Sequence, residues 1–476
     1  MVTKEEEEMP GEKRIKLCEG QEASKAEREP NYLNDPQAYD KWKTLIPYIY
    51  DFFTNHHTVW PSLSCRWGPV EKEEKYKRRQ KIYLSEQTDP ASVGTTDVNK
   101  LLVGHADVIK PKVASGDSLS TFLDLSRSPF IKIKKQIYHP GEVNRIRESP
   151  LDKSIVATHT DSCWTYLWNM EKQPDRTADK DYRQLSQADM ILEGHKDNAE
   201  YALAASSQDY SFASGGKDKL VLLWSIGDEV STLLGHNKER SSVTSGGYGG
   251  LVSPTLAPRI AFEGHADTVE DVAFHPKNSH ELVSVGDDKS VRFWDARAGS
   301  GEVLSVIDAD DGDVQSVDWC GQDENLVLTG TSNAVVKVFD RRKLSSGTGA
   351  KRNELIRLTH HTKGILCVEW CPNQKGVFAS SAEDGVLNVW DMGKTHSKSS
   401  DVPPQLLFQH VGHRAEVGDF QWNPEDPWTI LSTSNDNSLR GGGGTLQVWR
   451  MNDLIYRPEE EVLEELERQR EKILGK

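Results

Sequence analysis

The stretch Gly264–Arg297, GHADTVEDVAFHPKNSHELVSVGDDKSVRFWDAR, decides the fold of this chain. It begins with Gly-His and closes on Trp294-Asp295. The short runs between them alternate polar and apolar residues, which predicts three strands. His275-Pro276 and Gly286–Lys289 supply the turns. Strands this short cannot bury an apolar face alone, so the unit requires neighbours of the same kind.

The neighbours follow a fixed spacing. His265 lies 29 residues before Trp294, and the same step links further pairs: His139 to Trp168, His195 to Trp224, His361 to Trp390 and, in a degenerate copy, Asp310 to Phe339. A stretched copy runs from His413 to Trp449. Repeats of about 40–45 residues bounded by Gly-His and Trp-Asp are typical of four-stranded WD40 propeller blades. Six copies in register therefore predict a propeller.

Strands before the first copy predict a seventh blade. Val59–Trp67 is typical of a strand, and Gln80–Glu86 and Lys100–Val103 are its expected partners. We expect the C-terminal strand near Trp449 to close this blade, because joining both chain ends removes the last free edge. The predicted fold class is all-β: a seven-bladed WD40 β-propeller over residues 57–452, with an N-terminal helix and a C-terminal helix packed on its side.

Polar residues recur at fixed positions within the copies. In three copies an Asp lies six residues before the closing Trp. We expect His, Asp, a Ser and the Trp indole to form one buried hydrogen-bond chain, because each bare buried polar group costs about 1–3 kcal/mol. These residues are therefore interpreted as structural: His195, Asp218, Trp224, His265, Asp288, Trp294, His361, Asp384 and Trp390.

The degenerate copy departs from this pattern. Asp310 stands in place of the His, and Asn333 in place of the Asp. We expect this blade to lack the hydrogen-bond chain and to depend on packing.

Both ends of the chain predict structure outside the propeller. Residues 1–30 are charged and poor in aromatic residues, which predicts a disordered tail. Residues 31–56 predict a helix with Pro36 at its first position, a disruption at Pro47 and an apolar stripe. This helix either packs on the propeller or forms part of a groove for another helix. Residues 453–476 predict a second helix that opens at Pro458 and docks beside the first.

Composition narrows the function. The net charge of −16, from 74 acids against 58 bases, favours basic partners over nucleic acid, although it also serves solubility. The six cysteines form neither a disulfide framework nor a CxxC pair, so we expect no metal and no other cofactor. The sequence contains no apolar run of about 18 residues, so we predict no membrane span. No GxSxG, HExxH or phosphate-loop motif is present, so we predict a binding scaffold, not an enzyme.

Several segments together resemble a known family. They are WKTLIPYIYDFF, VWPSLSCRW, HPGEVNRIR, TVEDVAF, VPPQLLFQHVGH, WNPEDPW and DLIYRPEEEV. The chain resembles, over roughly residues 38–470, the histone-binding WD-repeat family of the retinoblastoma-binding and chromatin-assembly small-subunit type. The ending GGGGTLQVWRM…LIYRPEEEV is most similar to its plant, FVE-like branch.

The resemblance implies a non-enzymatic chromatin adaptor in the nucleus. Such an adaptor brings histones H3 and H4 to deacetylase, methyltransferase or assembly complexes, with transcriptional repression and, in plants, flowering-time control. No sequence-specific contact with nucleic acid and no contact with a membrane is implied.

The family's first peptide site is a groove for a helix of histone H4. It lies between the N-terminal helix and a loop with a double proline, here Ser397–Leu407. Animal relatives carry several acids in that loop, and this chain departs from them with Asp401 alone. The matching residues are Tyr39, Trp42, Ile46, Ile49, Phe53, Asp401, Pro403 and Pro404.

The family's second site is the mouth of the central channel, which takes basic peptides such as the histone H3 tail. The matching residues are Trp60, Pro61, Glu142, Asn144, Arg145, Tyr201 and Glu270. Acids there pair with Arg or Lys of the peptide, and Tyr201 stacks on it. Gln315, Gly364 and Glu416 depart from the animal pattern, so the preferred peptide is expected to differ.

A second function remains open on these residues. Trp294, Asp295 and Arg297 resemble the WDxR box through which some propellers join cullin-RING ubiquitin ligases, and Asp340 and Arg342 belong to a weaker copy. The chain would then be a ligase substrate receptor that binds a cullin adaptor. Because Trp-Asp closes many blades, only the arginines add information.

Overall fold

The structure is a computed structural model of the whole chain. It describes residues 35–88, 98–113, 119, 127–178, 185–234, 253–299, 302–306, 309–344, 354–395, 402–435 and 443–474. The tail predicted over residues 1–30 lies outside these residues.

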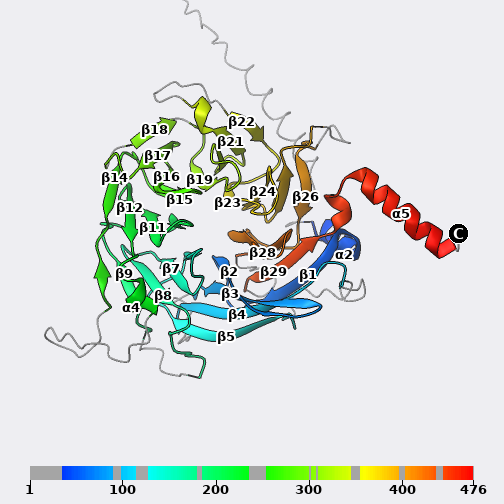
Figure 1. Cartoon of the computed structure of the whole chain (residues 1–476), viewed down its shortest axis with the longest axis horizontal. Coiled ribbons are helices and arrows are strands. Elements are labelled where there is room, and N and C mark those ends of the chain that lie inside the picture. The colour runs from blue at the N-terminus through cyan, green and yellow to red at the C-terminus, as the bar shows by residue number, and fades with distance from the viewer. Residues whose placement is uncertain are drawn as a thin grey trace, which may run out of the picture.

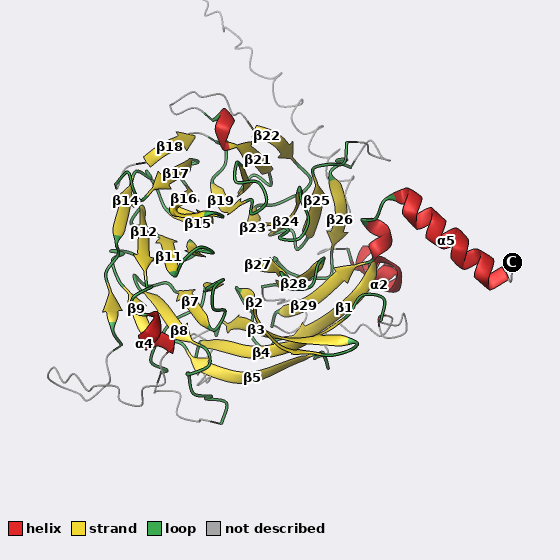
Figure 2. Ribbon diagram, in the orientation of Figure 1, coloured by secondary structure: helices red, strands yellow, loops and turns green. Residues whose placement is uncertain are grey.

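Seven β-sheets stand in a ring around a central channel (Figure 1, Figure 2). This confirms the predicted seven-bladed propeller. Apolar side chains of neighbouring blades pack together between the sheets, so the core is a ring of clusters. The tryptophans of the repeats are buried in this ring: Trp168, Trp224, Trp294, Trp390 and Trp449.

The blades are numbered here in chain order, each with its innermost strand first. Blade 1 holds β2 (Cys65–Glu73), β3 (Lys77–Glu86), β4 (Lys100–Ile109) and β5 (Ile131–Tyr138). Blade 2 holds β6 (Arg145–Glu148), β7 (Ile155–His159), β8 (Thr165–Asn169) and β9 (Met190–Leu192), with the short parallel strand β13 (Thr255–Leu256) on its outer edge. Blade 3 holds β10 (Leu203–Ala205), β11 (Ser211–Gly215), β12 (Leu220–Ser225) and β14 (Ile260–Glu263).

Blades 4 to 7 complete the ring. Blade 4 holds β15 (Val269–His275), β16 (Asn278–Gly286), β17 (Val291–Asp295) and β18 (Glu302–Val306). Blade 5 holds β19 (Val314–Trp319), β20 (Leu326–Thr331), β21 (Val336–Asp340) and β22 (Glu354–Leu358). Blade 6 holds β23 (Ile365–Trp370), β24 (Val377–Ala382), β25 (Leu387–Asp391) and β26 (Leu406–His410). Blade 7 holds β27 (Asp419–Trp422), β28 (Thr429–Thr433), β29 (Thr445–Met451) and β1 (Tyr50–His57).

The ring closes in a different blade from the one predicted. β29 does not join blade 1, which is complete with β2 to β5. Instead β1 pairs antiparallel with β29, so that Phe53 lies opposite Trp449. The chain ends still close the ring together, as the edge argument requires, but through an N-terminal strand that the sequence patterns did not reveal.

The N-terminal helix is shorter than the predicted 31–56. Helix α2 covers Pro36–Ile49, and the Asp35 carboxylate caps it by accepting from Gln37 N (2.9 Å) and Ala38 N (3.1 Å). Pro47 removes one backbone donor near the end, and the helix stops two residues later. The aromatic and β-branched residues that follow are good strand formers, and the open edge of β29 draws them into β1.

The C-terminal helix α5 (Glu459–Leu474) leaves the propeller instead of docking along α2 (Figure 1). Its side chains Ile473 and Leu474 are 83% and 61% exposed. The prediction of a helix here is correct, whereas the prediction that it packs on the propeller's side is wrong. Three short helices complete the described elements: α4 (Val230–Leu234), η1 (Arg341–Lys343) and η3 (Asp453–Ile455).

The predicted hydrogen-bond chain is complete in blades 4 and 6. The Trp294 indole donates to Ser284 Oγ (2.7 Å), which contacts His265 Nε2 (2.7 Å), and His265 Nδ1 lies 2.9 Å from Asp288 Oδ2. Burial raises the pKa of Asp288, but the hydrogen bond and the charge of His265, together with hydrogen bonds from Ser290 and the Ala266 backbone, outweigh burial and hold that pKa below its usual range. His361, Ser380, Asp384 and Trp390 repeat the arrangement.

The other repeats depart from this hydrogen-bond pattern. In blades 2 and 7, His139 Nδ1 contacts the Gly141 carbonyl and His413 Nδ1 contacts Thr445 Oγ1 instead of an Asp. Blades 3 and 5 depart in other ways. His195 contacts Asp218 and Ser214, but the Trp224 indole donates to the Glu193 carbonyl instead (3.1 Å). In the degenerate blade 5, Lys337 Nζ forms an ion pair with Asp310 (2.7 Å), and both side chains are 1% exposed. That blade therefore holds a buried ion pair, where the sequence had predicted packing alone.

Candidate peptide-binding sites

The candidate mouth residues gather at one end of the channel because each lies where an innermost strand begins. Arg145 opens β6, Glu270 is the second residue of β15, and Tyr201 lies just before β10. Neighbouring innermost strands contact one another around the axis, so these strand starts share one rim. Trp60-Pro61 joins them through Gln87, whose backbone N–H donates to the Pro61 carbonyl and whose side chain donates to Glu142 (2.8 Å).

The rim has an exposed aromatic side chain, Tyr201, above the buried side chains of Asn144 and Arg145. Tyr201 is 41% exposed, so its face can stack on a ligand. Arg145 is only 5% exposed and donates through Nε to the Tyr201 carbonyl (3.2 Å), which fixes the loop that carries the ring. Asn144 is also buried, at 6%. Asn144 and Arg145 thus support the rim from below, and Tyr201, Glu142 and Glu270 face outward.

Glu270 is the most perturbed carboxyl on the rim. Burial, followed by the nearby acids Asp287 and Glu200, raises its pKa to about 7, and Arg145 only partly opposes this. A carboxylate held among other acids gains most when a cation arrives, because the cation relieves both the repulsion and the desolvation. Glu200, which forms an ion pair with Lys217 (2.5 Å), was missed in the sequence, although it directly precedes Tyr201.

Gln315, Gly364 and Glu416, the three residues that depart from the animal pattern, also lie at the mouth of the channel. A Cβ on Gly364 would lie 3.2 Å from Gln315 Oε1 and 3.3 Å from Glu383 Oε1. Gln315 Oε1 is buried and has no hydrogen-bond partner among the described residues. Glu416 accepts from Asn435 Nδ2 (3.4 Å). Glu383, which no sequence pattern singled out, therefore adds a carboxylate near the position where Gly364 lacks a side chain.

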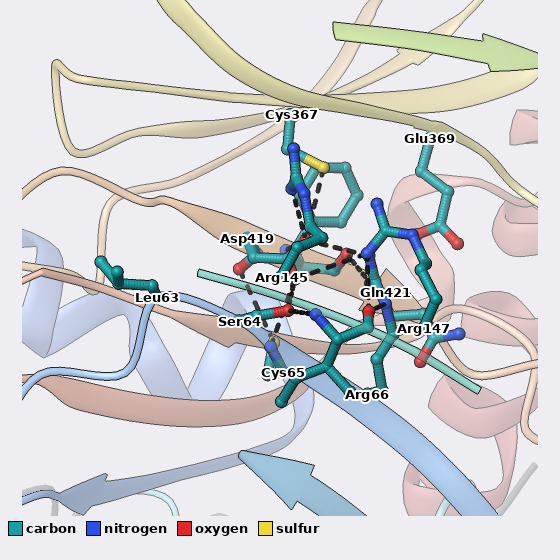
Figure 3. A network of polar contacts seen from close by, with 12 residues as sticks. Leu63, Ser64, Cys65, Arg66, Arg145, Arg147, Cys367, Glu369, Asp419 and Gln421 are labelled. Carbon is teal, nitrogen blue, oxygen red and sulfur yellow. Dashed lines mark hydrogen bonds and ion pairs between the residues drawn. The ribbon is translucent and has the colours of Figure 1, made fainter. Parts of the chain in front are cut away.

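A buried ionic network forms the floor of the mouth (Figure 3). Asp419 Oδ1 lies 3.2 Å from Arg66 Nη2 and 3.7 Å from Arg145 Nη1, and the Asp419 side chain has no exposed surface. Ser64 Oγ donates to Asp419 Oδ2 (2.6 Å). This network joins blades 1, 2 and 7 at the point where the ring closes. Sequence reasoning missed Arg66 and Asp419, whose signal is a charge inside an otherwise buried strand.

Below the floor the channel widens into a cavity of about 270 Å³. Arg147, Asp318 and Glu369 are among the charged side chains that line it. Asp318 and Glu369 each accept a backbone N–H from the next blade, from Trp370 (2.7 Å) and Trp422 (3.0 Å). These carboxylates therefore tie neighbouring blades together, and Arg66 belongs both to the network and to the lining of the cavity.

The predicted groove residues on α2 form the packing face of the helix. Tyr39, Trp42 and Ile46 are at most 5% exposed and pack against blade 7 together with Phe53, which lies in β1. Ile49 is partly buried against the same cluster. Assigning these side chains to a peptide groove was therefore wrong, because the apolar stripe is the part of the helix that the propeller covers.

The outer face of α2 and the double-proline loop remain open. Leu45 and Tyr48 are 43% and 75% exposed, and Pro403 and Pro404 are partly exposed. The strand that follows the prolines packs against β1, where the Tyr50 hydroxyl lies 2.6 Å from His410 Nδ1. A groove on this side would thus use Leu45 and Tyr48. Asp401 lies outside the described residues.

Comparisons with known proteins agree with this architecture. A family model for the histone-binding protein RBBP4 and its counterpart in the CAF1 complex matches residues 37–110. The WD domain, G-beta repeat model matches residues 187–225, 257–295, 352–391 and 404–440. The chain is 47% identical over 473 residues to the WD-40 repeat-containing protein MSI4 of Arabidopsis thaliana, covering 98% of this chain and 91% of that protein.

The chain belongs to the RBBP4-type histone-binding WD40 family. It is 31% identical to the WD-40 repeat-containing protein MSI3 of Arabidopsis thaliana, covering 89% of this chain and 92% of that protein. It is also 26% identical to the histone acetyltransferase type B subunit 2 of Candida glabrata, covering 91% of this chain and 93% of that protein. Members of this family are scaffolds built on a propeller.

The WDxR boxes of this RBBP4-type chain are paired internally. Arg297 is 59% exposed and bonds Asp295 through Nε (2.9 Å) and Nη2 (2.7 Å), and Arg342 is 64% exposed and bonds Asp340 in the same way. Trp294 is 1% exposed, so only the Asp and Arg of its box could touch a partner. The comparisons offer no support for a ligase role.

The described residues contain no group of three or more His, Cys, Asp or Glu that could hold a metal ion. The five cysteines in that part of the chain, Cys65, Cys163, Cys320, Cys367 and Cys371, are free thiols. None of the described helices is both long and apolar enough to span a membrane.

Proposed function

We propose that this chain is a histone-binding chromatin adaptor whose channel mouth takes a basic peptide such as the histone H3 tail. The observation that carries the proposal is the environment of Glu270, a partly buried carboxyl surrounded by other acids next to the exposed ring of Tyr201. A lysine or arginine side chain supplies the missing positive charge, and the ring of Tyr201 covers its aliphatic part.

The floor of the mouth limits how such a peptide binds. The Arg66–Asp419–Arg145 network is buried and its groups are already paired with one another, so a ligand side chain stops above it. Binding therefore depends on the rim acids Glu142, Glu200 and Glu270. Gly364 leaves room beside Glu383, which supports a peptide preference different from that of animal relatives.

A helix of histone H4 is the proposed ligand of the flank. It would lie along the outer face of α2, against Leu45 and Tyr48, with the double proline as the opposite wall. The packed stripe below holds α2 in place for this contact.

The remaining assignments rest on the family. We infer that the chain works without catalysis, in the nucleus, and brings histones to deacetylase, methyltransferase or assembly complexes; the name of the Candida relative, a histone acetyltransferase subunit, supports membership in such a complex. A role in repression and flowering time stays an expectation from the resemblance to the plant branch.

The test is a calorimetric titration of the full chain with an H3-tail peptide. The variant Glu270→Gln keeps the shape of the side chain and is expected to weaken binding roughly tenfold or more, because a charge-assisted hydrogen bond contributes about 1.5–3 kcal/mol. Glu425→Gln removes the same charge at the opposite end of blade 7, where Glu425 is 52% exposed, and is expected to have little effect. Absence of H3-peptide binding by the folded wild type would contradict the proposal.

A further inference from the structure

Helix α5 runs away from the propeller (Figure 1), and four of its apolar side chains are exposed. Leu463, Leu466, Ile473 and Leu474 are 53%, 47%, 83% and 61% exposed. Single exposed apolar residues are common, but four on one side of a 16-residue helix expose apolar area that costs free energy in water. The helix therefore presents a face that needs a partner.

The base of α5 is anchored, which fixes where this face points. Tyr456 stacks on Trp428 with ring centroids 4.2 Å apart, and Arg457 pairs with Asp453 (3.2 Å) and Glu465 (2.5 Å). Lys112, from the end of blade 1, also pairs with Asp453 (3.2 Å). Beyond this anchor the helix runs away from the propeller, so the stripe is displayed and not folded back.

The pattern along the stripe is that of a two-helix contact. Leu463, Leu466, Arg470 and Ile473 follow one another at steps of three, four and three residues, which is the spacing of a coiled-coil seam. On a helical wheel, Glu460, Glu467 and Glu471 lie along one edge of the seam. Glu465 lies beyond the other edge. The apolar stripe is thus bordered by acids along one edge.

This charge arrangement disfavours a second copy of the chain as the occupant. In an antiparallel pair each edge faces the same edge of the partner, so Glu460, Glu467 and Glu471 would face their own copies. In a parallel pair Arg470 would face Arg470 inside the seam. Like charges at these positions are destabilising, and both ways of self-pairing bring them together.

We propose that α5 is a docking helix for a basic amphipathic helix of a partner protein. The partner's apolar side packs on Leu463, Leu466 and Ile473, and its lysines or arginines lie beside Glu467 and Glu471. A contact about 15 Å long from Leu463 to Ile473, from 1.5 Å per residue, suits a weak, exchangeable attachment. This surface is separate from the channel mouth and from α2, so it adds a third contact beyond the proposed histone sites.

The probe is a pair of labelled synthetic helices of about 20 residues, long enough to form in solution. Both carry the same leucine seam, and their edges are lysines in one and glutamates in the other. The full chain is titrated with each helix by fluorescence anisotropy. We expect the lysine-edged helix to bind at least about tenfold more tightly, and its affinity to fall as salt is raised.

The double variant Leu466→Gln/Ile473→Gln removes the seam without changing charge and keeps good helix-forming residues. It is expected to weaken the lysine-edged helix about tenfold or more. Leu454→Gln, at an exposed leucine in η3, is the matched control and should bind like the wild type. Equal binding by the double variant would overturn the proposal, because attraction would then come only from the net charge. So would concentration-dependent dimerisation of the wild type that the double variant abolishes.

Discussion

The channel mouth and the flank of blade 7 use similar residues in opposite ways. At the mouth the aromatic ring of Tyr201 is exposed above a buried arginine, whereas on the flank Tyr39 and Trp42 of α2 are buried and the opposite face of the helix is exposed. The mouth residues lie at the starts of the innermost strands or in the loops just before them. The apolar side chains of α2 recur at regular spacing because they pack against the propeller. Regular spacing therefore marks architecture here, and the strand starts mark the ligand surface.

The largest expected difference between the regions is in stability. Trp42→Ala should lower the free energy of unfolding by about 3–5 kcal/mol, because it empties a buried site between α2 and blade 7. Tyr201→Ala should change it by at most about 0.5 kcal/mol, because the ring is exposed. Urea denaturation of both variants measures the contrast. Similar values for the two variants would remove the distinction between a packed flank and an open mouth.

A smaller effect separates hydroxyl groups in the two regions. Tyr50→Phe should cost about 1–3 kcal/mol, since it leaves His410 Nδ1 buried without its partner at 2.6 Å. Tyr201→Phe should leave the unfolding free energy within about 0.5 kcal/mol of the wild type. Thermal or urea unfolding can follow both. An unchanged unfolding free energy in Tyr50→Phe would mean that this contact contributes nothing to holding β1 of blade 7 against blade 6.

Binding at the mouth should depend on pH, whereas binding on the flank should not follow the same titration. The pKa of Glu270 is about 7 in the free protein, so at lower pH the carboxyl is protonated and a cation must displace the proton. Affinity for a basic peptide should thus rise between about pH 6 and 8, by less than the limit of about tenfold per pH unit for one proton. Calorimetry at several pH values measures this, and Glu270→Gln should flatten the curve.

The smallest effect is expected at the WDxR boxes. Arg297→Ala removes an exposed ion pair with Asp295 and should change the unfolding free energy by about 0–1 kcal/mol. H3-peptide affinity should be unchanged, because Arg297 follows β17 at the end remote from the rim. A pulldown with a cullin adaptor that depends on Arg297 would show a further function that neither region explains.

Six of the seven blades could be predicted because each repeat begins and ends at recognisable residues. The spacing from His265 to Trp294 recurs in other blades, and its hydrogen-bond chain explains why. Ring closure could not be read in this way, since β1 has no repeat signature and becomes a strand only beside β29. The Trp224 indole and the Asp310–Lys337 pair likewise depend on neighbours that the repeat does not specify.

The candidate sites were predicted unevenly for the same reason. The mouth residues came from the family resemblance, and the structure shows that Tyr201 and Glu270 both lie close to the start of an innermost strand. Arg66 and Asp419 are more than 350 residues apart in the chain and meet only when blade 7 closes against blade 1. On the flank, the stripe of α2 indicated correctly that the helix has an apolar face, but a stripe alone cannot say whether that face is a groove or a core.

The most direct test pairs the two regions in one experiment. H3-tail and H4-helix peptides are titrated separately by calorimetry into the folded wild type, Glu270→Gln and Tyr48→Ala. The structure predicts that Glu270→Gln weakens only the H3 peptide and that Tyr48→Ala, at a side chain 75% exposed on the outer face of α2, weakens only the H4 helix. Loss of H3-peptide binding in Tyr48→Ala, with full binding retained in Glu270→Gln, would contradict the assignment of the channel mouth as the basic-peptide site.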